Sequence, residues 1–366
     1  MNSFRTQISG FGFAILLLLP TLDQLLGLSA RFSSTENRQL NGIPPLNFPH
    51  VRSFVHQFDQ YYKENFGWRN ALFYAYSRWK LYGLGESPLP EKVVVGKNGW
   101  FYLGNSYNQV MDQHRGLHPL SADSARIIAN HLDMRRQELA RQGTQLYVFI
   151  APDSHTIYPE HLPDHLQPSD EPSRLDILKK AVLQQRLPFI DVRDTLWAAK
   201  RNHVVYFQTD THWNDYGTLI GCASLVNRIR QDDPAIPAMS LTDFQIEEQR
   251  GIGGDLVHML TVQDEMKDPV YYYIKPTPDR TARQTETVPN NAFGFPSTRY
   301  VGPGTKKLLF IGDSFSHSMM QFLPGYFRES FFVRDNKLEP ALLQAEKPDI
   351  VVIEVVERNI SYLANF

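Results

Sequence analysis

One serine, one histidine and one aspartate have the residue types and spacing to carry out chemistry. Ser314 lies in GDSFS, directly after the apolar run LLFI, and Asp210 and His212 lie well before it in TDTHWND. A serine hydroxyl becomes a nucleophile when an imidazole removes its proton and a carboxylate fixes the imidazole tautomer. These residues therefore predict a nucleophilic Ser314 with His212 as its base and Asp210 as the orienting partner.

The local sequence is compatible with this pairing. If residues 209–213 are extended, residues two apart project to the same side, so the Asp210 carboxylate can reach the proximal ring nitrogen of His212. Ser314 would end a strand and begin a helix, whose amide groups and dipole favour a developing negative charge. In the alternative interpretation, Asp210 caps the helix that begins near Asn214, and His212 is a surface or packed histidine.

A different alternative makes Asp210 and His212 ligands of a metal such as iron, with a third ligand from elsewhere in the chain. The candidates for that third ligand are His155, His258 and His317. This interpretation leaves the turn at Ser314 without a role, and no recognisable ligand spacing supports it. We therefore expect neither a metal nor a cofactor.

Several neighbours of these clusters are expected to support the site. Gly312 and Asp313 precede the serine, and Asp313 is expected to cap or brace the turn. Trp213 either presents an aromatic face to a sugar or packs in the core behind the histidine. Three residues of the segment APDSHTIYPE are expected to line the cleft, namely Asp153, His155 and Tyr158. An ion pair that fixes the C-terminal helix is expected among Glu354, Glu357 and Arg358.

The elements that would position these residues alternate between helices and short apolar strands. Helices are predicted over 121–142, 174–185 and 215–230, and strands over 146–150, 189–192 and the segments KLLFI, SFFVR and DIVVIEVV. This alternation is typical of an α/β fold with a parallel sheet covered by helices on both faces. Because ligands gather at the carboxyl edge of such a sheet, the polar clusters that follow its strands are expected to meet there.

The chain is predicted to have three parts. Residues 1–30 begin with a basic residue and a short apolar segment, which is the order of an export signal. Residues 31–120 are predicted to form a helical cap with a small β-hairpin around the Asn98-Gly99 turn. Residues 121–366 are predicted to form the catalytic domain, with an irregular excursion from the sheet at 231–304.

The N-terminal segment leaves two export interpretations open. Its uninterrupted apolar part is short for a spanning helix, which needs about 20 predominantly apolar residues, and Pro20 and Asp23 interrupt it. We favour an uncleaved signal anchor over a signal peptide cleaved near Leu28-Ser29-Ala30. A buried N-terminal helix of a cytosolic protein is the remaining alternative.

Composition narrows the classes of function. The chain has 366 residues, of which 42% are hydrophobic and 21% charged, as in one large or two moderate globular domains. The chain has 37 Lys and Arg residues and 39 Asp and Glu residues. Its net charge of −2 provides no overall attraction to nucleic acid. The one cysteine, Cys222, excludes an intramolecular disulfide and a cysteine-rich metal site.

The motifs resemble those of the SGNH-hydrolase-like proteins of the alginate O-acetyltransferase type, the AlgX/AlgJ group. Similar blocks occur in the same order over most of residues 36–360, namely ENRQL, VVVGKNGWFYL, APDSHTIYPEHLP, TDTHWNDYG, GDLVHML, LLFIGDSFSHSM and KPDIVVIEVVERNI. The order of Asp-His before Ser is also that group's order, the reverse of ordinary SGNH esterases. The resemblance therefore implies an SGNH-like sheet with a reversed motif order.

The resemblance also implies a function. It implies a serine-dependent O-acetyltransferase that adds acetyl groups to a secreted polysaccharide through an acetyl-serine intermediate on Ser314. It implies a periplasmic enzyme anchored to the inner membrane, with a multi-pass membrane acyltransferase as its acetyl source. Because no carbohydrate-binding module is expected after the last predicted strand, the chain resembles the group's shorter, anchored members. The alternatives are a carbohydrate acetylesterase with the same triad and a non-catalytic scaffold of a polysaccharide export complex.

Overall fold

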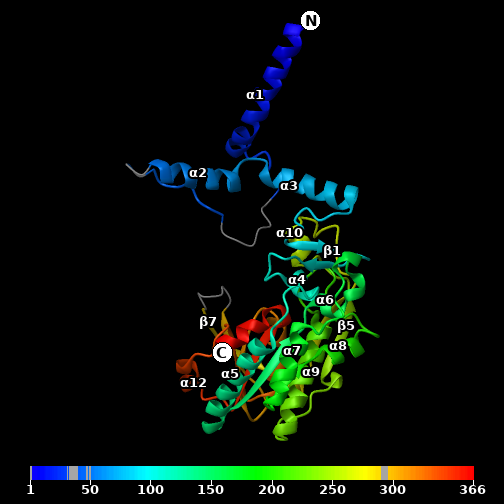
Figure 1. The fold of residues 1–366 in the computed structure, drawn as a ribbon, viewed down its shortest axis with the longest axis vertical. Helices are drawn as coiled ribbons and strands as arrows, with labels where there is room; N and C mark the ends of the chain where they lie inside the picture. The colour runs from blue at the N-terminus through cyan, green and yellow to red at the C-terminus, as the bar shows by residue number, and fades with distance from the viewer. Residues whose placement is uncertain (1, 31, 33–39, 47, 49–50, 290–295) are drawn as a thin grey trace. The chain divides into compact units, whose positions relative to one another are not determined.

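The computed structural model describes residues 2–30, 32, 40–46, 48, 51–289 and 296–366, which form two compact units (Figure 1). The first unit comprises residues 1–90 and 257–265, and the second comprises residues 91–256 and 266–366. The small hairpin that was predicted to belong to the cap falls in the second unit. The division therefore lies earlier in the chain than the predicted boundary at residue 120.

The first unit is helical. Its elements are α1 (Asn2–Leu26), α2 (Val51–Asn65), α3 (Arg69–Arg78) and a π-helical stretch, η1 (Trp79–Leu84). Within the part of the chain that the structure describes, no helix combines the length and the apolar character needed to cross a membrane.

Asp23 joins the end of α1 to the turn between α2 and α3. Its buried carboxylate accepts hydrogen bonds from the backbone nitrogen of Trp68 at 2.7 Å and from the nitrogen and hydroxyl of Ser29, both at 2.6 Å. A Cβ at Gly67 would lie 2.1 Å from the carbonyl oxygen of Pro20, so only glycine allows this approach. The charged residue inside the apolar segment is therefore a structural link within the first unit.

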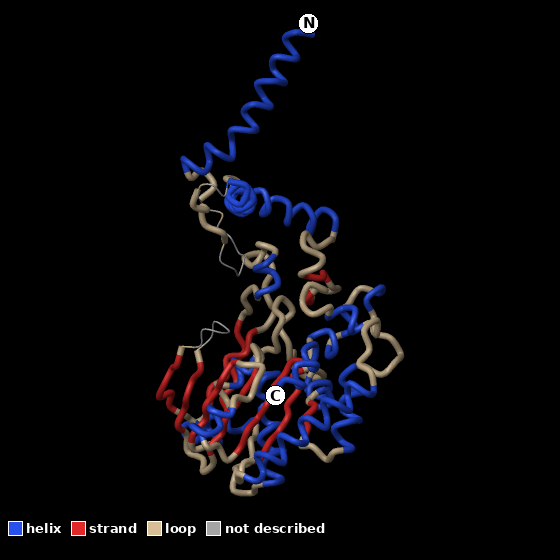
Figure 2. Tube along the Cα trace, turned by 60° about the vertical axis from the view of Figure 1, so that its left-hand side comes forward, coloured by secondary structure: helices blue, strands red, loops and turns tan. Residues whose placement is uncertain are grey.

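A seven-stranded sheet forms the centre of the second unit (Figure 2), in the order β4-β3-β11-β9-β10-β8-β7. Its strands are β3 (Gln145–Ala151), β4 (Phe189–Asp191), β7 (Arg283–Val288), β8 (Ser297–Val301), β9 (Lys307–Gly312), β10 (Glu329–Arg334) and β11 (Ile350–Val356). The five strands from β4 to β10 run parallel, and β8 and β7 add antiparallel pairs at one edge. The apolar runs predicted as parallel strands are confirmed.

The prediction that residues 231–304 form only an excursion from the sheet is wrong for their second half, because β7 and β8 extend the main sheet. Two small antiparallel pairs lie outside it, formed by β1 (Val93–Val95) with β2 (Phe101–Leu103) and by β5 (Phe244–Gln249) with β6 (Tyr271–Pro276). Between β1 and β2, Asn98 and Gly99 adopt positive φ angles of 57° and 81°, as expected for a tight hairpin turn.

Helices cover both faces of the sheet. The α-helices between these strands are α4 (Val110–His114), α5 (Ala122–Arg141), α6 (Ser154–Ile157), α7 (Arg174–Gln184), α8 (Arg193–Ala199), α9 (Asp215–Asp232), α10 (Asp255–Met259), α11 (Ser316–Met319) and α12 (Pro340–Glu346), and a 3-10 stretch, η7 (Glu357–Asn365), follows β11. On one face, Leu146, Val148 and Ile150 of β3 pack into a core with α5 and α7. On the other face, α9 packs beside Phe149, because a Cβ at Gly221 would lie 3.5 Å from its ring, which is an ordinary packing distance.

The carboxyl ends of three central strands meet at one edge. In register, Val356 of β11 pairs with Ala151 of β3, and Ile353 of β11 pairs with Ile311 of β9. The loops that follow these strands carry Asp153, Ser314 and Arg358. The polar clusters after β3 and β9 therefore lie at the same edge of the sheet.

Candidate active site

Asp210 and His212 lie on a tight loop and not at the end of a sheet strand. The loop is closed by an isolated antiparallel bridge between Tyr206 and Trp213. Within it, Asp210 Oδ1 lies 2.7 Å from His212 Nδ1 and accepts a hydrogen bond from the His212 backbone nitrogen at 3.0 Å. The predicted contact between carboxylate and imidazole is present, although a bent loop and not an extended segment produces it.

The cap of α9 is a different residue from Asp210. The side-chain oxygen of Asn214 accepts a hydrogen bond from the backbone nitrogen of Gly217 at 2.9 Å, which is the geometry of an N-cap. Asp210 therefore has no part in starting the helix, and the capping interpretation of this residue is wrong.

A second aspartate, Asp255, holds the same loop. Its two carboxylate oxygens accept hydrogen bonds from the Thr211 nitrogen at 2.8 Å and the Thr211 hydroxyl at 2.7 Å. Its own backbone nitrogen donates to Asp210 Oδ2 at 2.9 Å, and the Thr211 hydroxyl lies 3.0 Å from His212 Nδ1. Asp255 thus holds both Asp210 and Thr211, the two residues whose oxygens lie next to His212 Nδ1.

Two further residues make this loop rigid. The buried Asp268 carboxylate accepts hydrogen bonds from the Gln208 nitrogen and the Thr209 hydroxyl. A Cβ at Gly254 would lie 2.5 Å from the Asp210 Cβ and 2.7 Å from the Thr209 carbonyl oxygen, so this close approach requires glycine. Neither Asp255 nor Asp268 stands out in the sequence, where Asp255 occurs only as part of the block GDLVHML.

The charges of the pair favour an ionised carboxylate beside a basic imidazole. Burial alone would raise the pKa of Asp210, but the hydrogen bond and charge of His212 outweigh it, so the pKa is lowered. Burial would likewise lower the pKa of His212, but Asp210 outweighs it and the pKa is raised. Burial, followed by the neighbouring Asp210 charge, raises the pKa of Asp255 to about 6.

Asp210, His212 and Asp255 also offer a donor set for a metal, because one ligand atom of each lies within 4.8 Å of the others. None of the three histidines considered from sequence as the third ligand belongs to this group. Hydrogen bonds to His212, Thr211 and the Asp255 nitrogen already account for the approach of these oxygens. The donor set therefore fits an imidazole held by carboxylates at least as well as it fits a cation.

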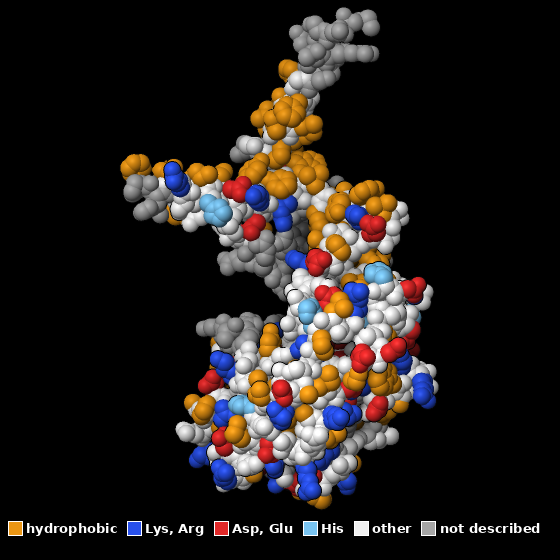
Figure 3. Space-filling model, in the orientation of Figure 1, with side chains coloured by type: hydrophobic (Ala, Val, Ile, Leu, Met, Phe, Trp, Pro, Cys, Tyr) orange, Lys and Arg blue, Asp and Glu red, His pale blue; other side chains and the backbone are white. Residues whose placement is uncertain are grey.

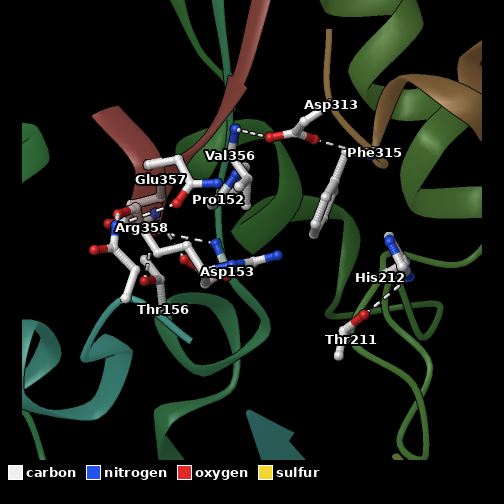
Figure 4. A network of polar contacts seen from close by, with 12 residues as sticks. Pro152, Asp153, Thr156, Thr211, His212, Asp313, Phe315, Val356, Glu357 and Arg358 are labelled. Atoms are coloured by element: carbon white, nitrogen blue, oxygen red, sulfur yellow. Dashed lines mark hydrogen bonds and ion pairs between the residues drawn. The ribbon is translucent and has the colours of Figure 1, made fainter. Parts of the chain in front are cut away.

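Ser314 follows β9 on a turn braced by its neighbours. Asp313 accepts hydrogen bonds from the Phe315 nitrogen at 3.0 Å and the Val356 nitrogen at 2.8 Å (Figure 4). A Cβ at Gly312 would lie 2.5 Å from a carboxylate oxygen of Glu354, and that oxygen also accepts from the Asp313 nitrogen at 2.9 Å. Asp313 has the bracing contacts expected of it, and the short α11 begins at Ser316.

Aromatic contacts join the serine turn to the histidine loop. The Phe315 ring lies 5.0 Å from the His212 ring and 5.4 Å from the Trp213 ring, and Trp213 Nε1 donates to the Ser318 hydroxyl at 2.8 Å. Trp213 is only 1% exposed, so it packs behind the histidine and does not present a face to a sugar. Of the two alternatives for Trp213, a sugar-binding surface and a core position, the structure supports the core position.

The distal nitrogen of His212 is shielded from solvent and has no hydrogen-bond partner among the described residues. A hydrogen bond from the Ser314 hydroxyl to this nitrogen is therefore not formed in this structure, although the ring of Phe315, the residue after Ser314, lies 5.0 Å from the His212 ring. In many enzymes such hydrogen bonds are long in the free protein and shorten when substrate binds.

The residues predicted to line the cleft after β3 lie elsewhere. Asp153, His155 and Tyr158 are all buried. Asp153 and His155 line a cavity of about 500 Å³, whose lining includes neither His212 nor Ser314. The Tyr158 hydroxyl accepts from the Val205 nitrogen at 3.0 Å and so has a packing role. These three residues do not join the Asp210–His212 pair.

A buried ion pair connects this cavity to the serine turn. The Arg358 guanidinium pairs with the Asp153 carboxylate and lies 5.7 Å from the Phe315 ring centroid (Figure 4). Glu357 accepts from the Thr156 hydroxyl at 2.7 Å, and burial raises its pKa to about 7. The predicted ion pair at the C-terminal segment therefore exists, but its acid is Asp153 and not Glu354 or Glu357.

A larger cavity, of about 700 Å³, lies beside α11. Its lining includes His317 and Ser318 of α11, Tyr271 of β6 and Tyr300 of β8. Because His317 and Ser318 belong to α11, this cavity adjoins the short helix that follows the serine turn.

The fold and these contacts define a class of protein, namely an α/β protein with a Gly-Asp-Ser turn at the carboxyl edge of its sheet and an Asp-His pair on a separate loop. Residues 93–331 match the sequence model of the family described as SGNH hydrolase-like domain, acetyltransferase AlgX. The chain belongs to this family.

Relatives that are similar to this chain in sequence carry the name probable alginate O-acetylase AlgJ. The Azotobacter vinelandii protein is 25% identical over 98% of this chain and 89% of its own length, and the Pseudomonas aeruginosa protein is 24% identical over 73% and 70%. The Pseudomonas syringae pv. tomato protein is 28% identical over 55% of this chain, and the match spans about half of that relative, 49%.

Solved structures support the fold alone. Bacillus cereus PatB1 is similar with a TM-score of 0.54 and 13% identity, covering 74% of this chain and 98% of that one. A DHHW family protein from Eubacterium siraeum has a TM-score of 0.50 and 14% identity, covering 75% and 95%. The SGNH-like α/β fold expected from the sequence is confirmed.

Asp255 provides a test of the electrostatics of this site. His212 can act as a base only when neutral, so activity should rise with pH through its pKa. The negative charge of Asp255 contributes to raising that pKa. Replacing Asp255→Asn should therefore move the acid side of the pH–rate profile to lower pH.

The matched control is Asp268→Asn, which alters the same loop without contributing to the His212 pKa. It should lower the thermal midpoint while leaving the acid side of the profile in place. An unchanged profile in Asp255→Asn, or the same shift in both variants, would contradict this electrostatic role.

Proposed function

We propose that the chain is a serine-dependent O-acetyltransferase that adds acetyl groups to a secreted polysaccharide. The observation that carries this proposal is the 2.7 Å contact between Asp210 Oδ1 and His212 Nδ1, which leaves the distal nitrogen of His212 available. Membership of a family described as acetyltransferase and the names of the AlgJ relatives support the same conclusion.

In the proposed reaction, the Ser314 hydroxyl attacks the carbonyl carbon of an acetyl donor and passes its proton to His212 Nε2. Asp210 stabilises the imidazolium, which then returns the proton to the leaving group of the donor. An acetyl ester on Ser314 remains. A sugar hydroxyl next loses its proton to His212 and attacks the ester, and His212 returns this proton to the departing Ser314 oxygen, so the acetyl group moves to the sugar and the serine is regenerated. If water takes the place of the sugar, the same steps give an acetylesterase.

The cavity beside α11 is the proposed position of the acceptor sugar. Tyrosine faces and hydroxyl, amide and imidazole groups are suited to bind a polyhydroxylated ring. The lining supplies Tyr271, Tyr300, Gln321 and His317 within one cavity. The proposed acetyl source is a multi-pass membrane acyltransferase.

The experiment that tests this function supplies the chain with an activated acetyl ester and candidate oligosaccharides. Mass spectrometry should detect an acetyl group on the peptide that contains Ser314 and, after longer incubation, on the sugar. Acetate released without acetylated sugar would favour the esterase. Absence of both acetyl-Ser314 and acetylated sugar, with every donor and acceptor pair, would favour the non-catalytic scaffold.

We also propose that the protein is periplasmic and that α1 holds it at the inner membrane. The support is the basic start and apolar run of this segment, with Phe11 76% and Leu16 65% exposed on the helix. N-terminal sequencing of the exported protein tests this localisation. A start at Met1 supports the anchor, whereas a start at Phe32 or nearby would show that the segment is removed.

A further inference from the structure

α2 exposes one continuous apolar stripe. Its residues Val51, Val55, Phe58 and Tyr62 follow one another at helical spacing and therefore lie on one face. They are 43%, 60%, 42% and 40% exposed, and no residue of this helix is buried. Aromatic rings run along the stripe, with Phe58 and Tyr62 stacked at 6.5 Å. The helix thus presents its apolar face outward and does not use it to build a core.

The segment formed by α3 and η1 exposes a second apolar stripe with the same spacing. Leu72, Tyr76 and Trp79 are 57%, 41% and 58% exposed, and the rings of Tyr76 and Trp79 lie 6.0 Å apart. Tyr82 and Leu84 continue this surface at 55% and 49% exposure. Two consecutive helical segments of the first unit therefore repeat one pattern.

α1 adds a third apolar surface to the same unit. Its exposed apolar side chains point in several directions around the helix, and they include Phe11, Phe13, Ile15, Leu16, Leu17 and Leu18. The hydrogen bond from the Trp68 nitrogen to Asp23 attaches this helix to the turn between α2 and α3. Figure 3 shows hydrophobic side chains gathered over these three helices. Soluble proteins rarely leave contiguous apolar surfaces of this extent uncovered.

We propose that α2 and the α3–η1 segment lie in the headgroup region of a phospholipid bilayer, with their apolar stripes toward the acyl chains. This inference rests on the proposed anchoring of the chain through α1. Helices with one apolar face and one polar face bind in the plane of a membrane interface in this way.

The composition of the stripes favours a bilayer over a protein partner. Tyr62, Tyr76, Trp79 and Tyr82 combine an apolar ring with a polar tip, which is the property that enriches Tyr and Trp at membrane–water interfaces. Beside its stripe, α2 carries two basic side chains, Arg52 and Lys63, and two acidic ones, Asp59 and Glu64, so it has no net negative charge to oppose binding at an anionic membrane surface. The physical link of these helices to α1 places the stripes next to the proposed anchor.

Site-specific fluorescence tests the proposal on the full chain. Because the one natural cysteine is buried, a new surface thiol can be labelled selectively with the environment-sensitive dye NBD. Phe58→Cys and Tyr76→Cys place the dye on the two stripes, and Gln60→Cys places it on the polar face of α2 as the matched control. With vesicles of phosphatidylcholine and phosphatidylglycerol, the two stripe labels should shift to shorter wavelength and be quenched by spin-labelled lipids. The Gln60→Cys label should emit at the same wavelength with vesicles as it does in water.

Three outcomes would overturn the proposal. If the protein binds vesicles but its stripe labels emit at the same wavelength as in water, then α1 contacts the membrane and α2 and α3 do not. A shift that depends on protein concentration and occurs without vesicles would show that a second copy covers the stripes. Failure of the labelled chain to bind vesicles would remove the proposed anchoring as well.

Acetyl transfer from a soluble donor, measured on the same labelled proteins, separates this proposal from the proposed function. The stripes belong to the first unit and contain no residue of the candidate site, so transfer should match that of the unlabelled chain. If acetyl transfer is retained but the stripe label emits as it does in water, only the proposed bilayer contact is contradicted. Tyr62→Cys serves as a second stripe position if one variant has a lowered thermal midpoint.

Discussion

Ser314→Ala is expected to abolish acetyl transfer almost completely, by roughly 10³-fold or more, without unfolding the protein. The substitution removes the oxygen that would carry the acetyl group. The described structure assigns no hydrogen bond to that oxygen, so its loss should leave no buried group unpaired. The measurement is the rate of sugar acetylation, with the thermal midpoint recorded on the same preparation.

Ser330→Ala is the matched control for this variant. Its hydroxyl is buried on β10 and has no partner in the described structure, so the same atom is removed away from the candidate site. This variant should keep its full rate. A Ser314→Ala protein that retains most of its activity would eliminate the covalent mechanism, whatever the control shows.

Asp210→Asn is expected to reduce the catalytic step by up to ~10⁴-fold. Asp210 Oδ1 accepts from the His212 backbone nitrogen, and Oδ2 accepts from the Asp255 backbone nitrogen. Both oxygens accept hydrogen bonds from N–H groups. Whichever way an asparagine side chain is turned, its NH2 group would therefore face one of these N–H donors. It also allows the wrong imidazole tautomer. The expected cost in stability is about 1–3 kcal/mol, from one unsatisfied buried donor.

The control for Asp210→Asn is again Asp268→Asn, which removes a buried carboxylate from the same loop without touching His212. If loosening of the loop were the cause, both variants would lose activity in proportion to their loss of stability. A large loss of rate confined to Asp210→Asn and Asp210→Ala supports the orienting role. An active Asp210→Asn would leave His212 without its proposed partner.

The sheet was predictable from sequence where burial leaves a continuous apolar pattern. β3, β9 and β11 are buried along nearly their whole length, so each is a nearly continuous apolar run, interrupted in β11 by Glu354. β7 was missed because every residue of Arg283–Val288 is exposed, and a strand at the edge of a sheet needs no apolar run. Edge strands formed by polar sequence look like loops until their hydrogen-bond partner is known.

The candidate site was predictable only in its local part. Asp210 and His212 are two residues apart, so their contact follows from short-range geometry, and Gly312 and Asp313 adjoin the serine. Asp255 and Asp268 reach the same loop from far along the chain, and no spacing rule connects an isolated aspartate to a distant threonine. The choice between core and surface for Trp213 also depends on the packing of α9 and Phe315, which the sequence does not specify.

The position of β11 has a consequence for the order of assembly. It is the last of the seven sheet strands along the chain, yet it lies between β3 and β9. Until it inserts, β3 and β9 have no neighbour to bridge them, and Val356 cannot donate to Asp313 in the serine turn. A chain that emerges from a ribosome or an export channel starting from its N-terminus would therefore pass through a state in which every candidate catalytic residue has been released but the serine turn is not yet braced. The proposed acetyl transfer should therefore begin in one late step, when the central strand inserts.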